Sequence, residues 1–117
     1  MKNEIYSFYH LSIDPAKFEA FKALTAELVA ATSKEPDTTI YEFVVNADHT
    51  KIHILERYRT ESLLPHTEQT FAPYAKRFLE LVSIDHLYVY GDTTPEIREV
   101  LDGFGAVYLT PFAGFAR

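Results

Sequence analysis

Residues 39–59, TIYEFVVNADHTKIHILERYR, hold two runs of β-branched and aromatic residues joined by a short polar segment. The runs span 39–45 and 51–59, and the segment 46–50 has the length and polarity of a hairpin turn. We therefore predict an antiparallel hairpin near the middle of the chain. The elements on either side of this hairpin then determine the topology.

A strand and a helix are predicted before the hairpin. Residues 5–13 are rich in aromatic and β-branched side chains and end at Asp14-Pro15, where Asp can cap a helix and Pro can occupy its first position. Apolar residues then recur at steps of three and four, which is typical of a helix with one buried face, up to a stop at Glu35-Pro36. The recurring residues are Phe18, Phe21, Leu24, Leu28 and Thr32.

A second helical region and a fourth strand are predicted after the hairpin. Helical spacing begins after Thr60, a candidate cap, and Pro65 and Pro73 divide the region into a short helix and a longer one. The β-prone run 84–90 then ends at Gly91. The order β-α-β-β-α-β predicts an α+β fold of the ferredoxin-like arrangement, in which an antiparallel sheet carries its helices on one face.

The end of the chain adds a helix and a strand to this core. Thr94-Pro95 is a good helix start, the helical pattern runs to Gly103, and residues 106–112 are again β-prone. The tail from Gly103 onward is rich in aromatic residues, namely Phe104, Tyr108, Phe112 and Phe115. We expect it either to cover a sheet edge or to close over the cavity of a partner, and we favour the first role.

Length and composition indicate one globular domain. The 117 residues fall within the usual size of a single domain, and no repeat, linker or charge block divides them. We predict one domain over 1–117, with a ferredoxin-like core at 3–92 and a C-terminal extension at 93–117. A net charge of −6 argues against nucleic-acid and membrane-surface partners, and the lack of cysteine excludes disulfides and thiolate chemistry. Because its start has no leader pattern, the protein is predicted to be cytoplasmic.

The predicted sheet leaves one face without helices, yet large apolar side chains point to both faces. Ile40 and Val44, for example, alternate along their strand with Tyr41 and Phe43. A second copy of the chain would cover the open face. This pattern predicts an isologous homodimer whose two sheets enclose a cavity.

Residues 56–66, ERYRTESLLPH, follow the hairpin and precede a helix that contains Phe71. This pattern resembles the antibiotic biosynthesis monooxygenase family, in which Glu-x-Trp/Tyr is followed by Ser, Asp or Thr with acidic residues, then by a leucine and a histidine. The Asp14-Pro15 helix start and Tyr41-Glu42-Phe43 also look like that family. The resemblance covers 3–92 and implies a dimeric α+β barrel that oxidises quinols or polyphenolic aromatics with molecular oxygen and without a cofactor.

The resemblance also indicates which residues face the ligand. Alternation along the strand puts Ile54, Glu56 and Tyr58 on one side, and in related enzymes the aromatic position at Tyr58 faces the pocket. His66 is the candidate catalytic base, because imidazole titrates near neutral pH. The candidate substrate-binding residues are Tyr58, Glu56, Ile54, Phe43 and Tyr88. Structural alternatives stay open: a surface or capping role for His66, an ion pair or dimer contact for Glu56, and a core position for Tyr58.

The predicted activity is cofactor-independent monooxygenation of a small aromatic, quinol-like molecule. Such a substrate supplies the electrons itself once a base has removed its proton in a dry pocket. No metal is predicted, because the five histidines lack metal-site spacing. Ser7, Tyr58 and Ala75 stand where haem-degrading relatives carry their functional residues, which argues against haem degradation. Two alternatives remain: a non-oxidative isomerase or decarboxylase, and a non-catalytic dimer that binds or senses a small ligand.

Overall fold

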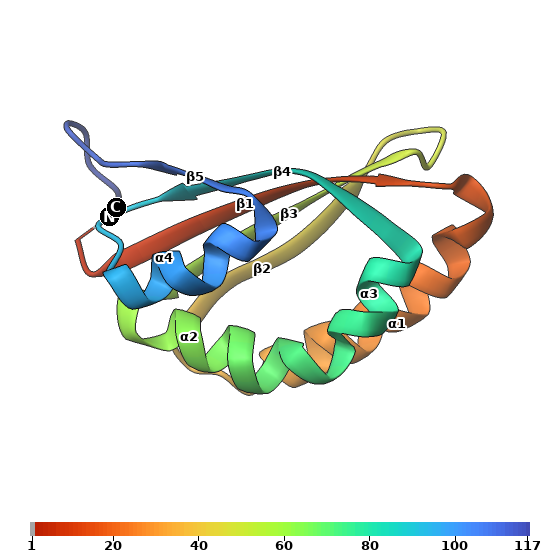
Figure 1. Ribbon diagram of the computed structural model, residues 1–117, viewed down its shortest axis with the longest axis horizontal. Helices are drawn as coiled ribbons and strands as arrows, with labels where there is room; N and C mark the ends of the chain where they lie inside the picture. The colour runs from red at the N-terminus through yellow and green to blue at the C-terminus, as the bar shows by residue number, and fades with distance from the viewer. Residues whose placement is uncertain (1) are drawn as a thin grey trace.

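The computed structural model describes residues 2–117 and contains a five-stranded sheet with its helices on a single face (Figure 1). The strands lie in the order β2-β3-β1-β4-β5. The first four of these pair antiparallel in the ferredoxin-like order, so the predicted fold class is confirmed. The strand bounds are β1 Glu4–Ile13, β2 Thr38–Val45, β3 Lys51–Arg59, β4 Val82–Tyr90 and β5 Ala106–Leu109.

The first crossover helix begins as the sequence predicts. The Asp14 side chain accepts a hydrogen bond from the backbone N–H of Ala16, and a 3-10 turn (Pro15–Lys17) leads into α1 (Phe18–Thr32). α1 buries one stripe of side chains against the sheet, which is the stripe found in the sequence. None of the helices described is both long and apolar enough to span a membrane.

The helical region between β3 and β4 contains a wide turn. In a regular helix Pro73 would lack an N–H to donate, and its ring would collide with the carbonyl four residues earlier. The six residues His66–Phe71 form a π-helical segment instead, and the Ala72 N–H reaches the Thr67 carbonyl five residues back. The region comprises a 3-10 turn (Thr60–Ser62), α2 (Leu63–Pro65), the π-helical segment, a 3-10 turn (Ala72–Tyr74) and α3 (Ala75–Leu81).

The C-terminal extension adds α4 (Pro95–Leu101), a 3-10 turn (Asp102–Phe104) and β5. Because α4 crosses back over the sheet, β5 pairs with β4 in parallel, and the complete sheet is mixed. The predicted strand 106–112 ends early, at Leu109, shortly before Pro111, which has no N–H for a ladder.

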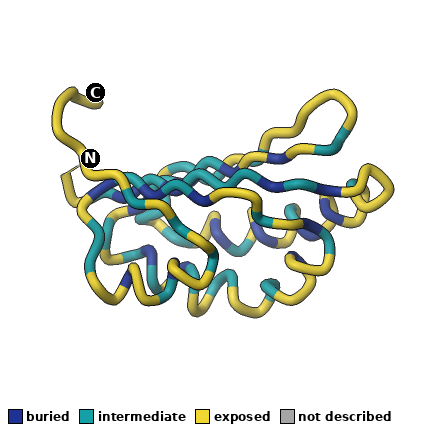
Figure 2. The backbone as a smooth tube through the Cα atoms, turned by 45° about the horizontal axis from the view of Figure 1, so that its top comes forward, coloured by how far each residue is buried: buried dark blue, intermediate teal, exposed yellow. Residues whose placement is uncertain are grey.

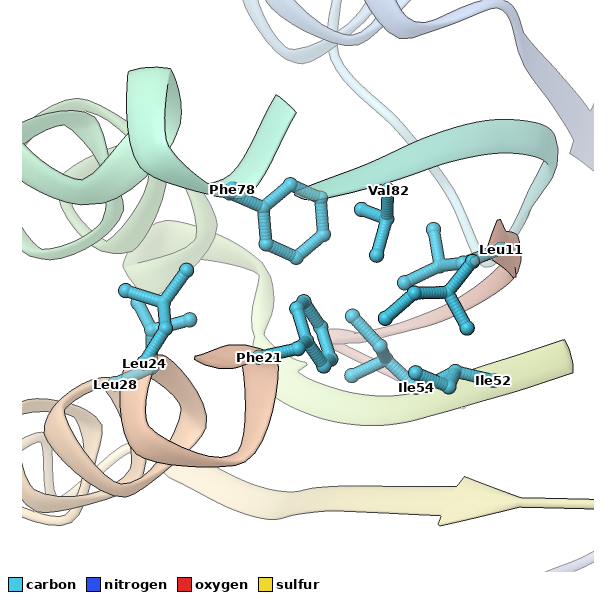
Figure 3. Packing of buried hydrophobic residues seen from close by; sticks show 9 residues of the cluster. Leu11, Phe21, Leu24, Leu28, Ile52, Ile54, Phe78 and Val82 are labelled. Carbon is cyan, nitrogen blue, oxygen red and sulfur yellow. The ribbon is translucent and has the colours of Figure 1, made fainter. Parts of the chain in front are cut away.

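The core lies between the sheet and the helices and consists of two apolar clusters. The first gathers around α1 and α3 and includes Phe21 and Phe78 (Figure 3). The second is built by β1, β3, β4, α2 and α4 and includes Ile5 and Tyr58. Tyr9 packs against both clusters, so β1 joins them. The extension is therefore a part of the core, because α4 contributes Ile97 and Leu101 to the second cluster.

No helix covers the opposite face of the sheet (Figure 2). The Phe8 and Tyr90 rings lie there with centroids 5.1 Å apart, and His10 stacks on His53 at 3.9 Å. In the tail, Phe112 and Phe115 are 99% and 78% exposed. Of the tail aromatics, Tyr108 lies in β5, which covers the edge of β4, whereas the exposed Phe112 and Phe115 cover no edge within one chain.

Gly91 ends β4 at a position that has no room for a side chain. Its φ is +133°, and a Cβ there would lie 2.6 Å from the Glu4 carbonyl oxygen and 2.8 Å from Cδ1 of Ile5. We expect Gly91→Ala to lower the free energy of unfolding by about 2 kcal/mol or more. Gly103→Ala is the matched control, because a Cβ at Gly103 would meet nothing within 4 Å. Urea unfolding of both variants measures the difference, and equal stabilities would contradict this prediction.

Candidate functional site

Two polar side chains, Glu56 and His66, are buried between the sheet and the helices. Glu56 comes from β3, where alternation turns Ile54, Glu56 and Tyr58 toward the helices. His66 is the first residue of the π-helical segment. Only 6% of Glu56 and 5% of His66 is exposed. Both ionisable side chains are thus held in a largely apolar interior, where burying them is costly unless they are paired.

Glu56 and His66 line one small cavity at the junction of the two apolar clusters. The space open to the centre of a water molecule is about 20 Å³, which is room for about one water. The polar lining residues are Tyr9, Tyr41, Glu56, His66 and Thr67, and the apolar ones are Ile54, Phe71, Phe78, Ile84 and Phe104. The cavity therefore combines titratable groups with aromatic walls.

A carboxylate holds the imidazole of His66. Nδ1 of His66 lies 3.0 and 3.1 Å from the two carboxylate oxygens of Glu35, in the turn after α1, and one of these oxygens also accepts a hydrogen bond from the Thr38 hydroxyl at 2.6 Å. Because a carboxylate can only accept, Nδ1 carries the hydrogen and Nε2 of the neutral ring keeps its lone pair. His66 is thus oriented as a base.

Burial keeps this base neutral. It lowers the pKa of His66, and the charge and hydrogen bond of Glu35 oppose this effect without reversing it. His66 is therefore uncharged at neutral pH and can accept a proton there. The rings of Tyr41 and Tyr58 pack against the imidazole with centroid distances of 5.5 and 5.2 Å, which fixes its plane.

The surroundings of Glu56 favour its neutral, protonated form. Burial raises its pKa well above the usual value, and the nearby charge of Glu35 raises it further. Burial also raises the pKa of Tyr9 and of Tyr41, and Glu56 adds to both effects. The cavity therefore presents protonated oxygens from three residues beside a neutral imidazole, an arrangement of proton donors and a proton acceptor.

The structure brings together only some of the residues that the sequence singled out. His66, Glu56 and Ile54 line the cavity, and Tyr58 is buried behind it against the His66 ring. Phe43 lies on the same face of the sheet, but it packs against Tyr41 and Phe21 in the first cluster and does not line the cavity.

Tyr88 lies on the other face of the sheet. Its neighbours Leu87 and Val89 point to the helices, so alternation turns Tyr88 to the open face, where its ring packs against His10 and His86. Tyr88 and Glu56 cannot touch the same ligand within one chain. The enclosed cavity also lies under the helices of a single chain, whereas we expected one between the sheets of two copies.

Several residues of the site were not foreseen. Glu35 was interpreted only as part of a helix stop, although it provides the partner of His66 from 31 positions away. Tyr9 and Tyr41 were assigned to strands without a role at a cavity. Phe104 was assigned to the extension. No local spacing in the sequence links these residues, because they meet only through the packing of distant elements.

Comparisons with known proteins identify the fold. No protein-family model matches the sequence, and neither does a curated protein. A solved structure from Nitrosomonas europaea, assigned to the antibiotic biosynthesis monooxygenases, superposes with a TM-score of 0.68 at 21% identity, over 80% of this chain and 93% of its own. SnoaB, a cofactor-independent oxygenase from Streptomyces nogalater, superposes with a TM-score of 0.62 at 15% identity, over 80% of this chain and 94% of its own. The chain has the fold of the antibiotic biosynthesis monooxygenases, as the resemblance at residues 56–66 predicts.

A further structure resembles the chain along its whole length. MupZ from Pseudomonas fluorescens superposes with a TM-score of 0.86 at 27% identity, and the match covers 100% of this chain and 91% of that one. The two matches above leave a fifth of the chain unmatched, whereas the match to MupZ includes the C-terminal extension. The extension is therefore a shared part of a variant of this fold.

Proposed function

We propose that the cavity is the active site of an enzyme that moves protons on a small aromatic molecule. His66 is the base, Glu35 orients it, and Glu56 is the proton donor. The observation that carries this proposal is the meeting, in one largely enclosed cavity, of a histidine held by a carboxylate and a buried acid with a raised pKa. A base whose pKa is lowered and an acid whose pKa is raised are the pair of groups that general acid–base catalysis uses.

The activity we propose first is cofactor-independent monooxygenation. His66 removes a proton from a CH₂ group activated by a phenol-like ring, and the resulting anion adds molecular oxygen and takes up a proton to give a hydroperoxide. Loss of water then breaks the O–O bond and the second C–H bond and forms a C=O group. Glu56 gives its proton to the departing oxygen, His66 takes the proton of the C–H bond, and the return of that proton to Glu56 restores the site. One oxygen atom ends in the product and one in water, and the substrate supplies all four electrons. The scaffold, shared with a cofactor-independent oxygenase, supports this choice.

A non-oxidative isomerase or decarboxylase is the second candidate. The observation in its favour is the set of protonated oxygens on Glu56, Tyr9 and Tyr41. These groups can hydrogen-bond to a carbonyl oxygen of the substrate and stabilise the enolate that forms when His66 takes a proton from the adjacent carbon. This chemistry needs no oxygen.

Two measurements on one panel separate the candidates. Metal-stripped, flavin-free protein is mixed with hydroquinones, naphthols and anthrone-like phenols, first in air with an oxygen electrode and then under argon in D₂O. Oxygen uptake above the autoxidation blank supports the monooxygenase. Anaerobic deuterium incorporation, or CO₂ release from carboxylated naphthols added to the panel, supports the second candidate if no oxygen is taken up in air. If ligands bind and neither reaction occurs, the protein is a binding or regulatory module and the proposal of an active site is wrong.

We also propose that the open face of the sheet pairs with a second copy of the chain. Phe8, Tyr88 and Tyr90 form an aromatic surface there, and Val107 beside them is 52% exposed. We expect sedimentation to show at least a dimer at micromolar concentration. Phe8→Lys should raise the dissociation constant of this dimer by about a hundredfold or more. Leu79→Lys, at an exposed position of α3, is the control. A stable monomer of the unaltered chain would contradict this proposal.

A further inference from the structure

The cavity cannot admit an aromatic ring in the state described. Its space is about that of one water molecule, and part of its wall belongs to the paired sheet and to the buried core. Ile54 and Glu56 belong to β3, which is paired on both sides, and Phe78 is 2% exposed in the first cluster. A small molecule can reach His66 only if some other part of the wall moves.

The part of the wall with room to move is the gate turn, which we define as the 3-10 turn Asp102–Phe104. Phe104 alone among the lining residues comes from the C-terminal extension, and its ring is only partly buried. It stands between Gly103 and Gly105, and Gly105 has a φ of +76°. A Cβ at either glycine would meet nothing within 4 Å, so open space surrounds the backbone of the turn.

Polar contacts, together with the packing of Phe104 against the second cluster, hold the gate turn in place. The Tyr108 hydroxyl on β5 donates to the Asp102 carboxylate at 2.7 Å, and the Arg98 guanidinium lies 4.3 Å from the centre of the Tyr108 ring. The Gly105 N–H donates to the Asp102 carbonyl at 3.0 Å. These contacts are exposed to water, which can replace them when the turn moves, so they break easily.

We propose that Phe104 is the gate to the cavity and sets the size of the molecule that reaches His66, with the Tyr108–Asp102 hydrogen bond as its latch. This inference rests on the proposed function in one respect: it takes the cavity to be the substrate site. Displacement of Phe104 opens the cavity at the junction of α4 and β5 and leaves the base, its orienting carboxylate and the acid in place. The extension would then supply the selectivity of this variant of the fold.

Acylation of His66 tests the gate without any substrate. Diethyl pyrocarbonate and the bulkier di-tert-butyl dicarbonate both acylate neutral imidazole, and peptide mass spectrometry gives the rate at His66 relative to His49 in the hairpin turn. We expect Phe104→Ala to raise the rate at His66 by about tenfold or more, and by a larger factor for the bulkier reagent. Tyr108→Phe, which only loosens the latch, should raise it severalfold.

The controls keep this test decisive. Phe112→Ala removes an exposed ring of the same extension and should leave the rate at His66 unchanged. Circular dichroism shows whether each variant stays folded at the temperature used. If Phe104→Ala does not fold, Tyr108→Phe alone still tests the proposal. An unchanged rate at His66 in Tyr108→Phe and in folded Phe104→Ala would overturn the proposal and move the entrance to the π-helical segment. Because acylation requires no turnover, a failure of the proposed activity would not alter this result.

Discussion

His66→Ala is expected to lower kcat/KM by about 10² to 10⁴, the usual contribution of a positioned general base. The imidazole is the only group among the lining residues that is neutral and basic near pH 7, because burial lowers its pKa. The measurement is the rate of oxygen uptake, or of anaerobic deuterium incorporation, with whichever substrate the panel yields. The same loss is expected for both candidate activities, since both begin with proton removal by His66.

Two further variants separate a chemical role from a structural one. Glu35→Gln keeps a hydrogen-bond acceptor beside Nδ1 of His66 and removes the charge that favours the protonated ring. We expect kcat/KM to fall by about tenfold. We also expect the acid limb of its pH profile to move to lower pH, because the pKa of His66 falls further. His49→Asn is the matched control, because Asn tolerates the positive φ of 59° at that turn position. A folded His66→Ala variant that keeps a third or more of the activity would exclude His66 as the base.

Much of the fold could be predicted from local patterns. The alternation of apolar residues along β3 matches its observed burial, and the helical stripe through Phe21, Leu24 and Leu28 is the buried stripe of α1. Such patterns predict burial in the folded protein because each face of a strand or helix meets one environment along its whole length. The early end of β5 at Leu109 departs from its pattern because Pro111 stops the ladder.

The site was less accessible to sequence reasoning, for a physical reason. Periodicity tells which residues share a face but not what covers that face, so Tyr88 was grouped with Glu56 although the two lie on opposite sides of the sheet. Glu35 joins His66 through a turn that the sequence marks only by a proline. The identity of His66 and Glu56 could be proposed because a motif contains them, whereas their partners come from tertiary packing.

Glu56→Gln is expected to stabilise the protein above pH 5. The folded-state pKa of Glu56 is raised, chiefly by burial, so the folded protein binds this proton more tightly than the unfolded chain does. The stability that this proton contributes is fully present below the unfolded pKa near 4.5 and is lost as pH rises toward the folded pKa. The loss is about 1.4 kcal/mol for each pH unit in that window. Glutamine cannot ionise, so the variant does not lose stability there.

Urea unfolding from pH 4 to pH 9 measures this difference directly. We expect the two proteins to have similar stability near pH 4 and to diverge as pH rises, with the variant the more stable. Glu42→Gln on β2 is the control, because its side chain is exposed, and it should leave the pH dependence in place. Parallel curves for Glu56→Gln and the unaltered protein would show that Glu56 is ionised when folded. The same variant should lose the proton donor, so activity should fall while stability rises, which is the opposition expected when a buried group is kept for chemistry rather than for folding.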